Sequence, residues 1–93
     1  MRTLLQQEYI PKIMYDDEAD VLYIKYGTNK GATAHEVGGN IIVYADDLTQ
    51  QPKTITILDY KWLKENRPGW ERNLPIDFDR DIKPLLEQSE VFS

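Results

Sequence analysis

Residues 12–27, KIMYDDEADVLYIKYG, have the pattern of a β-hairpin. Two short apolar and strand-favouring runs, residues 12–15 and 21–26, flank the acidic turn DDEAD. Short carboxylates in a turn accept hydrogen bonds from backbone N–H groups one or two residues further on, and so stabilise a chain reversal without glycine. We therefore expect two antiparallel strands joined by this acidic turn.

The second arm of the hairpin also predicts which side of the sheet is buried. Side chains alternate between the two faces of a strand, so every second residue shares a face. The expected core face carries Leu22, Ile24 and Tyr26, and the opposite face carries Val21, Tyr23 and Lys25.

Two further strands are expected after the hairpin. Residues 32–37 (ATAHEV) alternate as in a half-exposed strand, and residues 40–45 (NIIVYA) are apolar on both faces. Gly38 and Gly39 suit a two-residue hairpin turn between them, because such turns need positive φ and glycine adopts it freely. A strand that is apolar on both faces is either covered on both sides or leaves an apolar face for a partner.

The next part of the chain predicts one more strand and a change to helical periodicity. Residues 53–58 (KTITIL) form a strand with Ile55 and Ile57 inward, and Asp59 is the expected N-cap of a short helix. Residues 70–78 (WERNLPIDF) have no clear periodicity, and we expect their aromatic side chains to pack onto the body of the protein.

The last expected element is a helix over residues 82–90 (IKPLLEQSE), with Asp81 as its N-cap and Pro84 in its first turn. Its buried side would consist of Ile82, Leu85 and Leu86.

Together these elements predict one α+β domain over residues 1–93. Its core is an antiparallel β-meander of four to five strands, with one or two short C-terminal helices packed on one face. Parallel pairing would need crossover connections of about a dozen residues, for which the glycine turn leaves no room. The expected parts are an N-terminal arm (residues 1–11), the meander core (12–63), and a wrapping segment with the terminal helix (64–93).

Composition narrows the classes of function. The 93 residues include 16 acidic and 11 basic side chains, a formal net charge of −5, which repels a phosphate backbone. We therefore expect a protein partner, not nucleic acid. The lack of cysteine excludes a disulfide framework and a thiolate metal site. No apolar run approaches the length of a membrane span or of a signal peptide core, so we expect no membrane association and a cytoplasmic location.

Three blocks, YDDEADVLYIKY, EVGGNIIVYADD and KTITILDYKW, resemble the small bacterial family known as domain of unknown function 2283. The resemblance covers about residues 12–63 and implies the sheet fold. It carries over no catalytic or ligand-binding residue. Relatives are often encoded beside a small RelE-like toxin-type protein, so the resemblance also implies an antitoxin-like partner of a small basic toxin.

The acidic turn suggests one alternative function, a divalent-metal-dependent hydrolase. Asp16, Glu18 and Asp20 would supply the oxygen ligands that hard cations prefer. The turn does not match an EF-hand loop, which needs glycine at its sixth position and a carboxylate at its twelfth, where this chain has Val21 and Gly27. We expect no metal and no cofactor.

His35 is the single histidine and precedes Glu36. Neighbours on a regular strand point to opposite faces, so these two residues cannot serve one catalytic site unless the strand is bulged. The sequence has no serine-centred turn, glycine-rich phosphate loop or paired-histidine motif. We therefore expect no enzyme, but a small acidic protein-binding module.

The first expected partner is a second copy of the chain, because two short helices can cover one face of a sheet but hardly two. The predicted homodimer face carries Val21, Tyr23, Ile42, Tyr44 and Leu58. The rival interpretation is that residues 1–9 or 70–78 fold over this face within one chain, and a further alternative is a purely structural homodimeric domain.

Two sets of residues are predicted to contact partners. The partner-binding side chains are Tyr23, Ile42, Tyr44, Trp62, Trp70, Leu85 and Leu86. The carboxylates expected to face a basic toxin are Asp77, Asp79, Asp81, Glu87 and Glu90.

Overall fold

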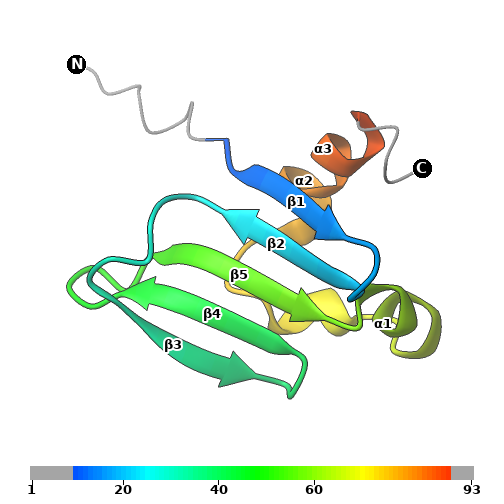
Figure 1. The fold of residues 1–93 in the computed structure, drawn as a ribbon, viewed down its shortest axis with the longest axis horizontal. Helices are drawn as coiled ribbons and strands as arrows, with labels where there is room; N and C mark the ends of the chain where they lie inside the picture. The colour runs from blue at the N-terminus through cyan, green and yellow to red at the C-terminus, as the bar shows by residue number, and fades with distance from the viewer. Residues whose placement is uncertain (1–9, 89–93) are drawn as a thin grey trace.

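The computed structural model describes residues 10–88, which form a five-stranded antiparallel sheet followed by short helices (Figure 1). The strands are β1 (Lys12–Asp16), β2 (Val21–Lys25), β3 (Ala32–Val37), β4 (Ile41–Asp46) and β5 (Pro52–Leu58). The helices are α1 (Tyr60–Asn66), the 3-10 helix η2 (Trp70–Asn73), α2 (Phe78–Asp81) and α3 (Lys83–Gln88). The expected α+β class is confirmed, and each expected strand is present.

The strand order is β1-β2-β5-β4-β3, which differs from that of a simple meander because β5 lies between β2 and β4. The reason lies in the side chains on the core face. Pairing β2 with β5 places Leu22 opposite Ile57, and such fully buried side chains belong at the centre of the sheet. The core-face positions of β3 include Thr33 and His35, which are exposed, so β3 suits an edge. The segment between β2 and β3 therefore carries the chain to the far edge of the sheet.

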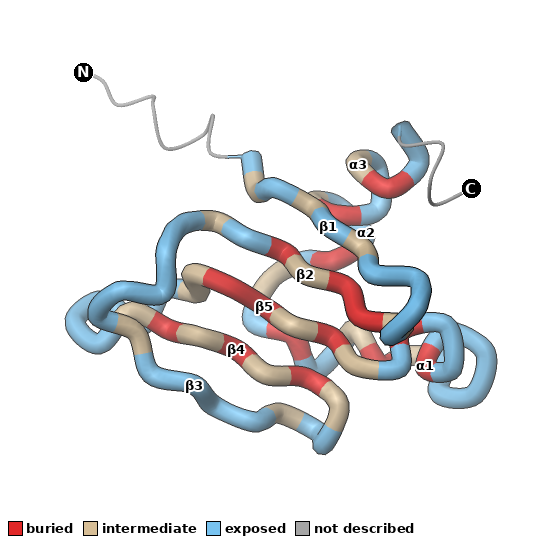
Figure 2. The backbone as a smooth tube through the Cα atoms, viewed as in Figure 1, coloured by how far each residue is buried: buried red, intermediate tan, exposed pale blue. Residues whose placement is uncertain are grey.

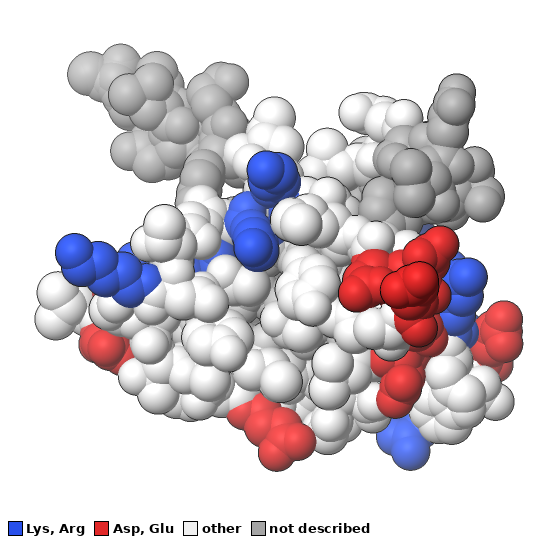
Figure 3. Space-filling view, in the orientation of Figure 1, with Lys and Arg blue, Asp and Glu red and all other residues white. Residues whose placement is uncertain are grey.

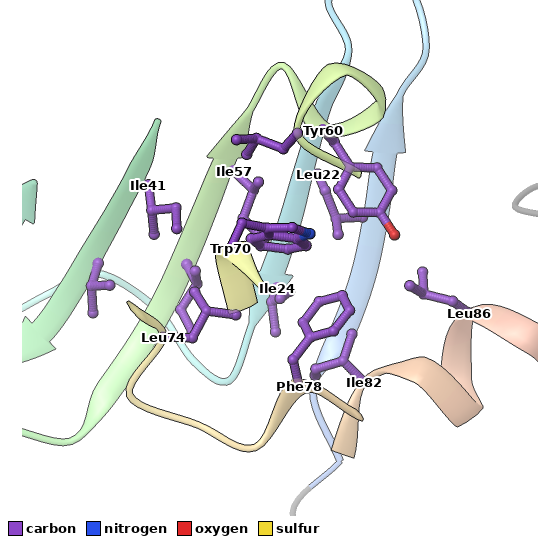
Figure 4. Close-up of a cluster of buried hydrophobic side chains, with 13 residues drawn as sticks. Leu22, Ile24, Ile41, Ile57, Tyr60, Trp70, Leu74, Phe78, Ile82 and Leu86 are labelled. Carbon is purple, nitrogen blue, oxygen red and sulfur yellow. The ribbon is translucent and has the colours of Figure 1, made fainter. Parts of the chain in front are cut away.

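All four helices lie on one face of the sheet, and the core fills the space between the two layers (Figures 1 and 4). In Figure 2 the buried residues alternate with half-buried ones along β4, as a strand with one covered face requires. The sheet contributes Leu22, Ile24, Ile41, Val43, Ile55 and Ile57 to this core, and the covering layer contributes Tyr60, Leu63, Trp70, Leu74, Phe78, Ile82 and Leu86.

Residues 70–78 wrap the body of the domain as expected, because their aromatic rings pack onto the core. The rings of Trp70 and Phe78 meet edge to face at a centroid distance of 5.0 Å, and Trp70 meets Tyr60 in the same way at 5.9 Å. Figure 4 shows these rings lying over the apolar side chains of β2 and β5. The wrapping segment thus covers the helix side of the sheet, which excludes residues 70–78 as a cover for the opposite face.

The β3–β4 turn is one residue longer than expected. Val37 pairs with Ile41, so the turn contains Gly38, Gly39 and Asn40. Both glycines have positive φ, 71° and 84°, which is the property for which glycine was expected here.

The C-terminal helices begin differently from the expectation. Residues 82–88 do not form one helix capped by Asp81, because Asp81 ends α2 and its carboxylate pairs with the Arg80 guanidinium at 3.0 Å. The residue that caps is Asp77, whose side chain accepts a hydrogen bond from the Arg80 backbone N–H at 3.1 Å. Pro84 lies in the first turn of α3, as expected.

Several expectations fall outside the described residues. These are most of the N-terminal arm, the rival cover by residues 1–9, and the end of the terminal helix with Glu90. Within residues 10–88, no helix has the length and apolar character needed to cross a membrane.

Candidate functional site

The acidic hairpin turn is held by its own carboxylates. Asp16 Oδ1 accepts hydrogen bonds from the backbone N–H groups of Glu18 at 3.1 Å and Ala19 at 3.2 Å. The interpretation of the turn as a reversal stabilised by short carboxylates is therefore confirmed, with acceptance two and three residues on.

The last residue of the turn, Asp20, ties the hairpin to helix α1. Its carboxylate accepts a hydrogen bond from the Tyr15 hydroxyl at 2.7 Å and from the Lys61 backbone N–H at 3.0 and 3.2 Å. Its carbonyl oxygen accepts a third, from the Tyr60 N–H at 3.1 Å. The first turn of a helix has N–H groups without partners in the helix, and an acidic side chain there also complements the helix dipole. Asp20 is thus the cap of α1, supplied from 41 residues away in the sequence.

Asp59, the expected N-cap, occupies the N-cap position but does not cap. Its backbone is left-handed, with φ 56°, and its side chain makes no capping hydrogen bond. Instead the Asp59 carboxylate accepts a hydrogen bond from the Asn40 side-chain amide at 3.1 Å, which links α1 to the β3–β4 turn. The capping interaction predicted for Asp59 is made by Asp20.

Asp20 and Tyr15 both keep one protonation state over a wide range around neutral pH, because their pKa values are shifted away from neutrality. Burial opposes ionisation of Asp20, but hydrogen bonds from the Lys61 N–H, the Tyr15 hydroxyl and the Trp62 N–H outweigh it and lower the pKa of Asp20 below 3.8. Burial, together with the hydrogen bond to Asp20 and its charge, raises the pKa of Tyr15 to about 12. A carboxylate held ionised beside a phenol held protonated is suited to a structural role, not to proton transfer near neutrality.

The turn is not arranged as a metal site. Oxygens of Asp16 and Asp20 already accept hydrogen bonds from backbone groups, and those of Asp20 are directed at α1. Across residues 10–88, no group of three or more His, Cys, Asp or Glu side chains is placed to hold a metal ion. The geometry therefore gives no support to the hydrolase alternative that uses Asp16, Glu18 and Asp20.

His35 and Glu36 lie on a regular strand and do not share a face. His35 pairs with Val43 and Glu36 with Ile42, in an uninterrupted register between β3 and β4. Val43 points into the core and Ile42 away from it, so the two β3 side chains point to opposite sides of the sheet.

The surface with the most distinctive chemistry is the sheet face opposite the helices, which we call the open face. Its middle row runs across all five strands as Met14, Tyr23, Thr56, Ile42 and Glu36. One flanking row is Lys12, Lys25, Thr54, Tyr44 and Ala34, and the other begins with Asp16, Val21 and Leu58. No described element lies over this face in Figure 1.

Apolar and aromatic side chains fill the centre of the open face. Tyr23, Ile42, Tyr44 and Leu58 are half-buried by their neighbours, and Met14 is 43% exposed. Figure 3 looks onto this face and shows an uncharged centre, with lysines where β1 begins and carboxylates at the β1–β2 turn. A sheet face of this composition is unusual next to water and typical of an interface.

The predicted partner-binding residues separate into two groups. Tyr23, Ile42 and Tyr44 lie together on the open face, whereas Trp62, 47% exposed, lies on α1. The buried side chains Trp70 and Leu86 belong to the core, and Leu85 beside Leu86 is half-buried, so we leave all three out of the candidate surface. Met14, Lys12 and Thr56 were not among the predicted residues, and their place on this face follows from the pairing of β1 and β5 with β2.

Two depressions lie on the helix side of the sheet. One, of about 220 Å³, lies between the β3–β4 turn and the segment after α1, next to Arg67 and Asn73. The other, of about 380 Å³, is lined by residues from Gly69 to Asp79, among them Glu71 and Arg72. The second also has the carboxylates of Asp77 and Asp79 on its lining, but Asp77 accepts the hydrogen bond from the Arg80 N–H and Asp79 pairs with Lys83, so we do not propose either depression as an active site.

Comparison with known proteins gives a family and nothing further. The family described as "Protein of unknown function (DUF2283)" matches residues 12–61. Neither the curated proteins nor the solved structures contain a significant match to the chain.

Proposed function

The chain belongs to the family described as "Protein of unknown function (DUF2283)", whose membership implies no activity, and we propose from the geometry that this protein is a protein-binding module. Its binding surface is the open face. The observation that carries this proposal is the largely apolar centre of that face, where Tyr23 and Ile42 lie on either side of Thr56 and Tyr44 lies in the next row, with no described element over them.

The physical argument is one of burial. A β-sheet in a small domain is stable when its apolar faces are removed from water, and the helices do this for one face only. Tyrosine suits the second face, since it adds large apolar area at low cost in side-chain entropy and keeps a hydroxyl for the rim. Binding a partner there buries apolar surface without refolding the chain.

The C-terminal carboxylates support a toxin-facing role less well. Asp77 caps α2, Asp81 pairs with Arg80, and Asp79 pairs with Lys83 at 3.6 Å. The antitoxin-like role thus rests on the family resemblance alone, and it stays a prediction, as does the cytoplasmic location.

A test compares two aspartate substitutions in the full chain. Tyr44→Asp places a charge on the open face, next to its middle row, and Trp62→Asp makes the same change at an exposed aromatic residue on α1. Self-association is measured by light scattering, and partner capture by pull-down from the source cell. The proposal predicts that Tyr44→Asp abolishes association while circular dichroism shows an intact fold, and that Trp62→Asp retains it. Association that survives Tyr44→Asp, or no specific association of the unmodified chain, would overturn the proposal.

A further inference from the structure

The open face carries opposite charges at the two ends of its first two strands. Lys12 and Lys25 are direct register partners at one end of the β1–β2 pair. Asp16, Asp17 and Glu18 lie at the other end, in the turn. The four residue-to-residue steps from Lys12 to Asp16 separate these ends by about 13 Å along β1. We call them the basic end and the acidic end.

This arrangement is complementary to itself. If two copies of the sheet pack face to face about a two-fold axis that runs along the middle row, each strand lies over its own counterpart in the opposite direction. The basic end of one copy then lies over the acidic end of the other, and the reverse contact occurs at the same time. A two-fold axis parallel to the strands would instead place Lys12 over Ala34 and Lys25 over Tyr44, and the carboxylate two residues further along β4, Asp46, is already paired with Lys53 at 3.3 Å.

The same axis matches the apolar side chains. The middle row packs against its own copy, so Tyr23, Thr56 and Ile42 form the centre of the interface. Tyr44, from the flanking row at the basic end, lies over Asn40 of the second copy, which is the neighbour of Leu58 in the sheet. Glu36 is at the edge strand, where the crossing of about 30° between packed sheets carries the two copies of that side chain apart.

We infer that the occupant of the open face is a second copy of this chain, packed face to face with its strands reversed, so that Lys12 lies over Asp16 of the other copy and both Lys12 and Lys25 lie next to Asp17 and Glu18 in its turn. This inference rests on the proposed function, since it names the partner of the same surface. The ion pairs lie at the rim, so they set the orientation while the apolar centre supplies most of the affinity.

The area of the interface determines the expected strength of dimerisation. Five strands about 4.8 Å apart and about 17 Å long give a footprint of roughly 350 Å² per copy before the relief of the side chains is counted. Two such footprints total about 700 Å², which is below the roughly 1,000 Å² expected of a stable specific interface, so we expect a weak dimer whose population depends on protein concentration.

Two charge-reversal variants test the orientation. Lys12→Glu with Lys25→Glu makes both ends acidic, and Asp17→Lys with Glu18→Lys makes both ends basic. Either variant alone then brings like charges together twice, and its dimer dissociation constant should rise by about tenfold or more. An equimolar mixture brings opposite charges together twice and should dimerise at least as well as the unmodified chain. Arg72→Glu with Lys83→Glu is the control for net charge, because both residues lie behind the sheet and dimerisation should persist.

Sedimentation of each variant over a concentration series distinguishes the outcomes. Monomers of both variants together with a heterodimer in the mixture support the inference. Dimerisation of either variant alone, or a mixture that stays monomeric, overturns the reversed orientation. An unmodified chain that is monomeric at all concentrations overturns the second copy as occupant, but partner capture that depends on Tyr44 would leave the proposed function standing.

Discussion

Replacing Asp20 with asparagine tests the cap that joins the hairpin to α1. The amide can still accept a hydrogen bond and tolerates the left-handed backbone of this residue, whose φ is 56°, so the change removes mainly the charge. A hydrogen bond to a charged acceptor contributes about 1.5–3 kcal/mol, against about 0.5–1.5 kcal/mol for a neutral one. Loss of the interaction with the helix dipole adds about 0.3–1 kcal/mol. We expect Asp20→Asn to lower the free energy of unfolding by about 1–2 kcal/mol at neutral pH.

The assay is thermal and urea unfolding followed by circular dichroism, with Asp59→Asn as the matched control. Asp59 also has φ 56° and lies at the N-cap position of α1, but its side chain makes no capping hydrogen bond. Its substitution should stay within about 0.5 kcal/mol of the unmodified chain. For a domain of this size, the loss at Asp20 corresponds to a Tm lower by about 5–15 °C. Equal losses for the two variants, or a larger loss at Asp59, would refute the assignment of the cap to Asp20.

Three further results are expected. Ile57→Val should cost about 1 kcal/mol because Ile57 is fully buried, whereas Ile42→Val on the open face should cost less in the monomer, as urea unfolding at low protein concentration would show. The pKa of Asp20 is lower in the folded than in the unfolded chain, so the stability that Asp20 contributes is complete above pH 3.8 and is lost as the pH falls through the folded pKa. Stability measured against pH should show this loss in the unmodified chain and not in Asp20→Asn. Burial, and to a smaller extent the charge of Glu71, raises the pKa of Tyr60 to about 12. The stability that Tyr60 contributes is therefore complete below pH 10 and falls between pH 10 and about 12. An absorbance titration of Tyr60→Phe should show one fewer phenol that ionises late.

The strands and their inward faces could be predicted from the sequence because the signal is local. A period of two, the acidic turn and the Gly38–Gly39 pair each involve neighbouring residues, and the structure confirms the strands and the core positions of Leu22 and Ile24. The order of the strands could not be predicted in the same way. It depends on which strands bury most apolar area when they are paired, and that places β5 between β2 and β4.

Helix capping shows the same limit. Asp59 has the residue type and position of an N-cap, yet the hydrogen bond to the N–H of Lys61 comes from Asp20, which no local pattern connects with α1. At the C-terminal helices, Asp77 and Asp81 were both suitable caps by residue type. In the structure Asp81 pairs with Arg80, and the first helix begins at Phe78, whose side chain is buried in the core.

The extent of the family match bears on where function lies. Residues 12–61 contain every strand and both ends of the Asp20–Lys61 cap, whereas the covering segment from Trp62 onward lies outside the match. The acidic turn is accounted for by the hydrogen bonds that it makes within the hairpin and to α1. The open face, in contrast, consists entirely of residues within the family match, and no other described element packs against it. A function that family members share is therefore better sought on the open face than in the acidic turn, and Tyr44→Asp should impair it more than Trp62→Asp does.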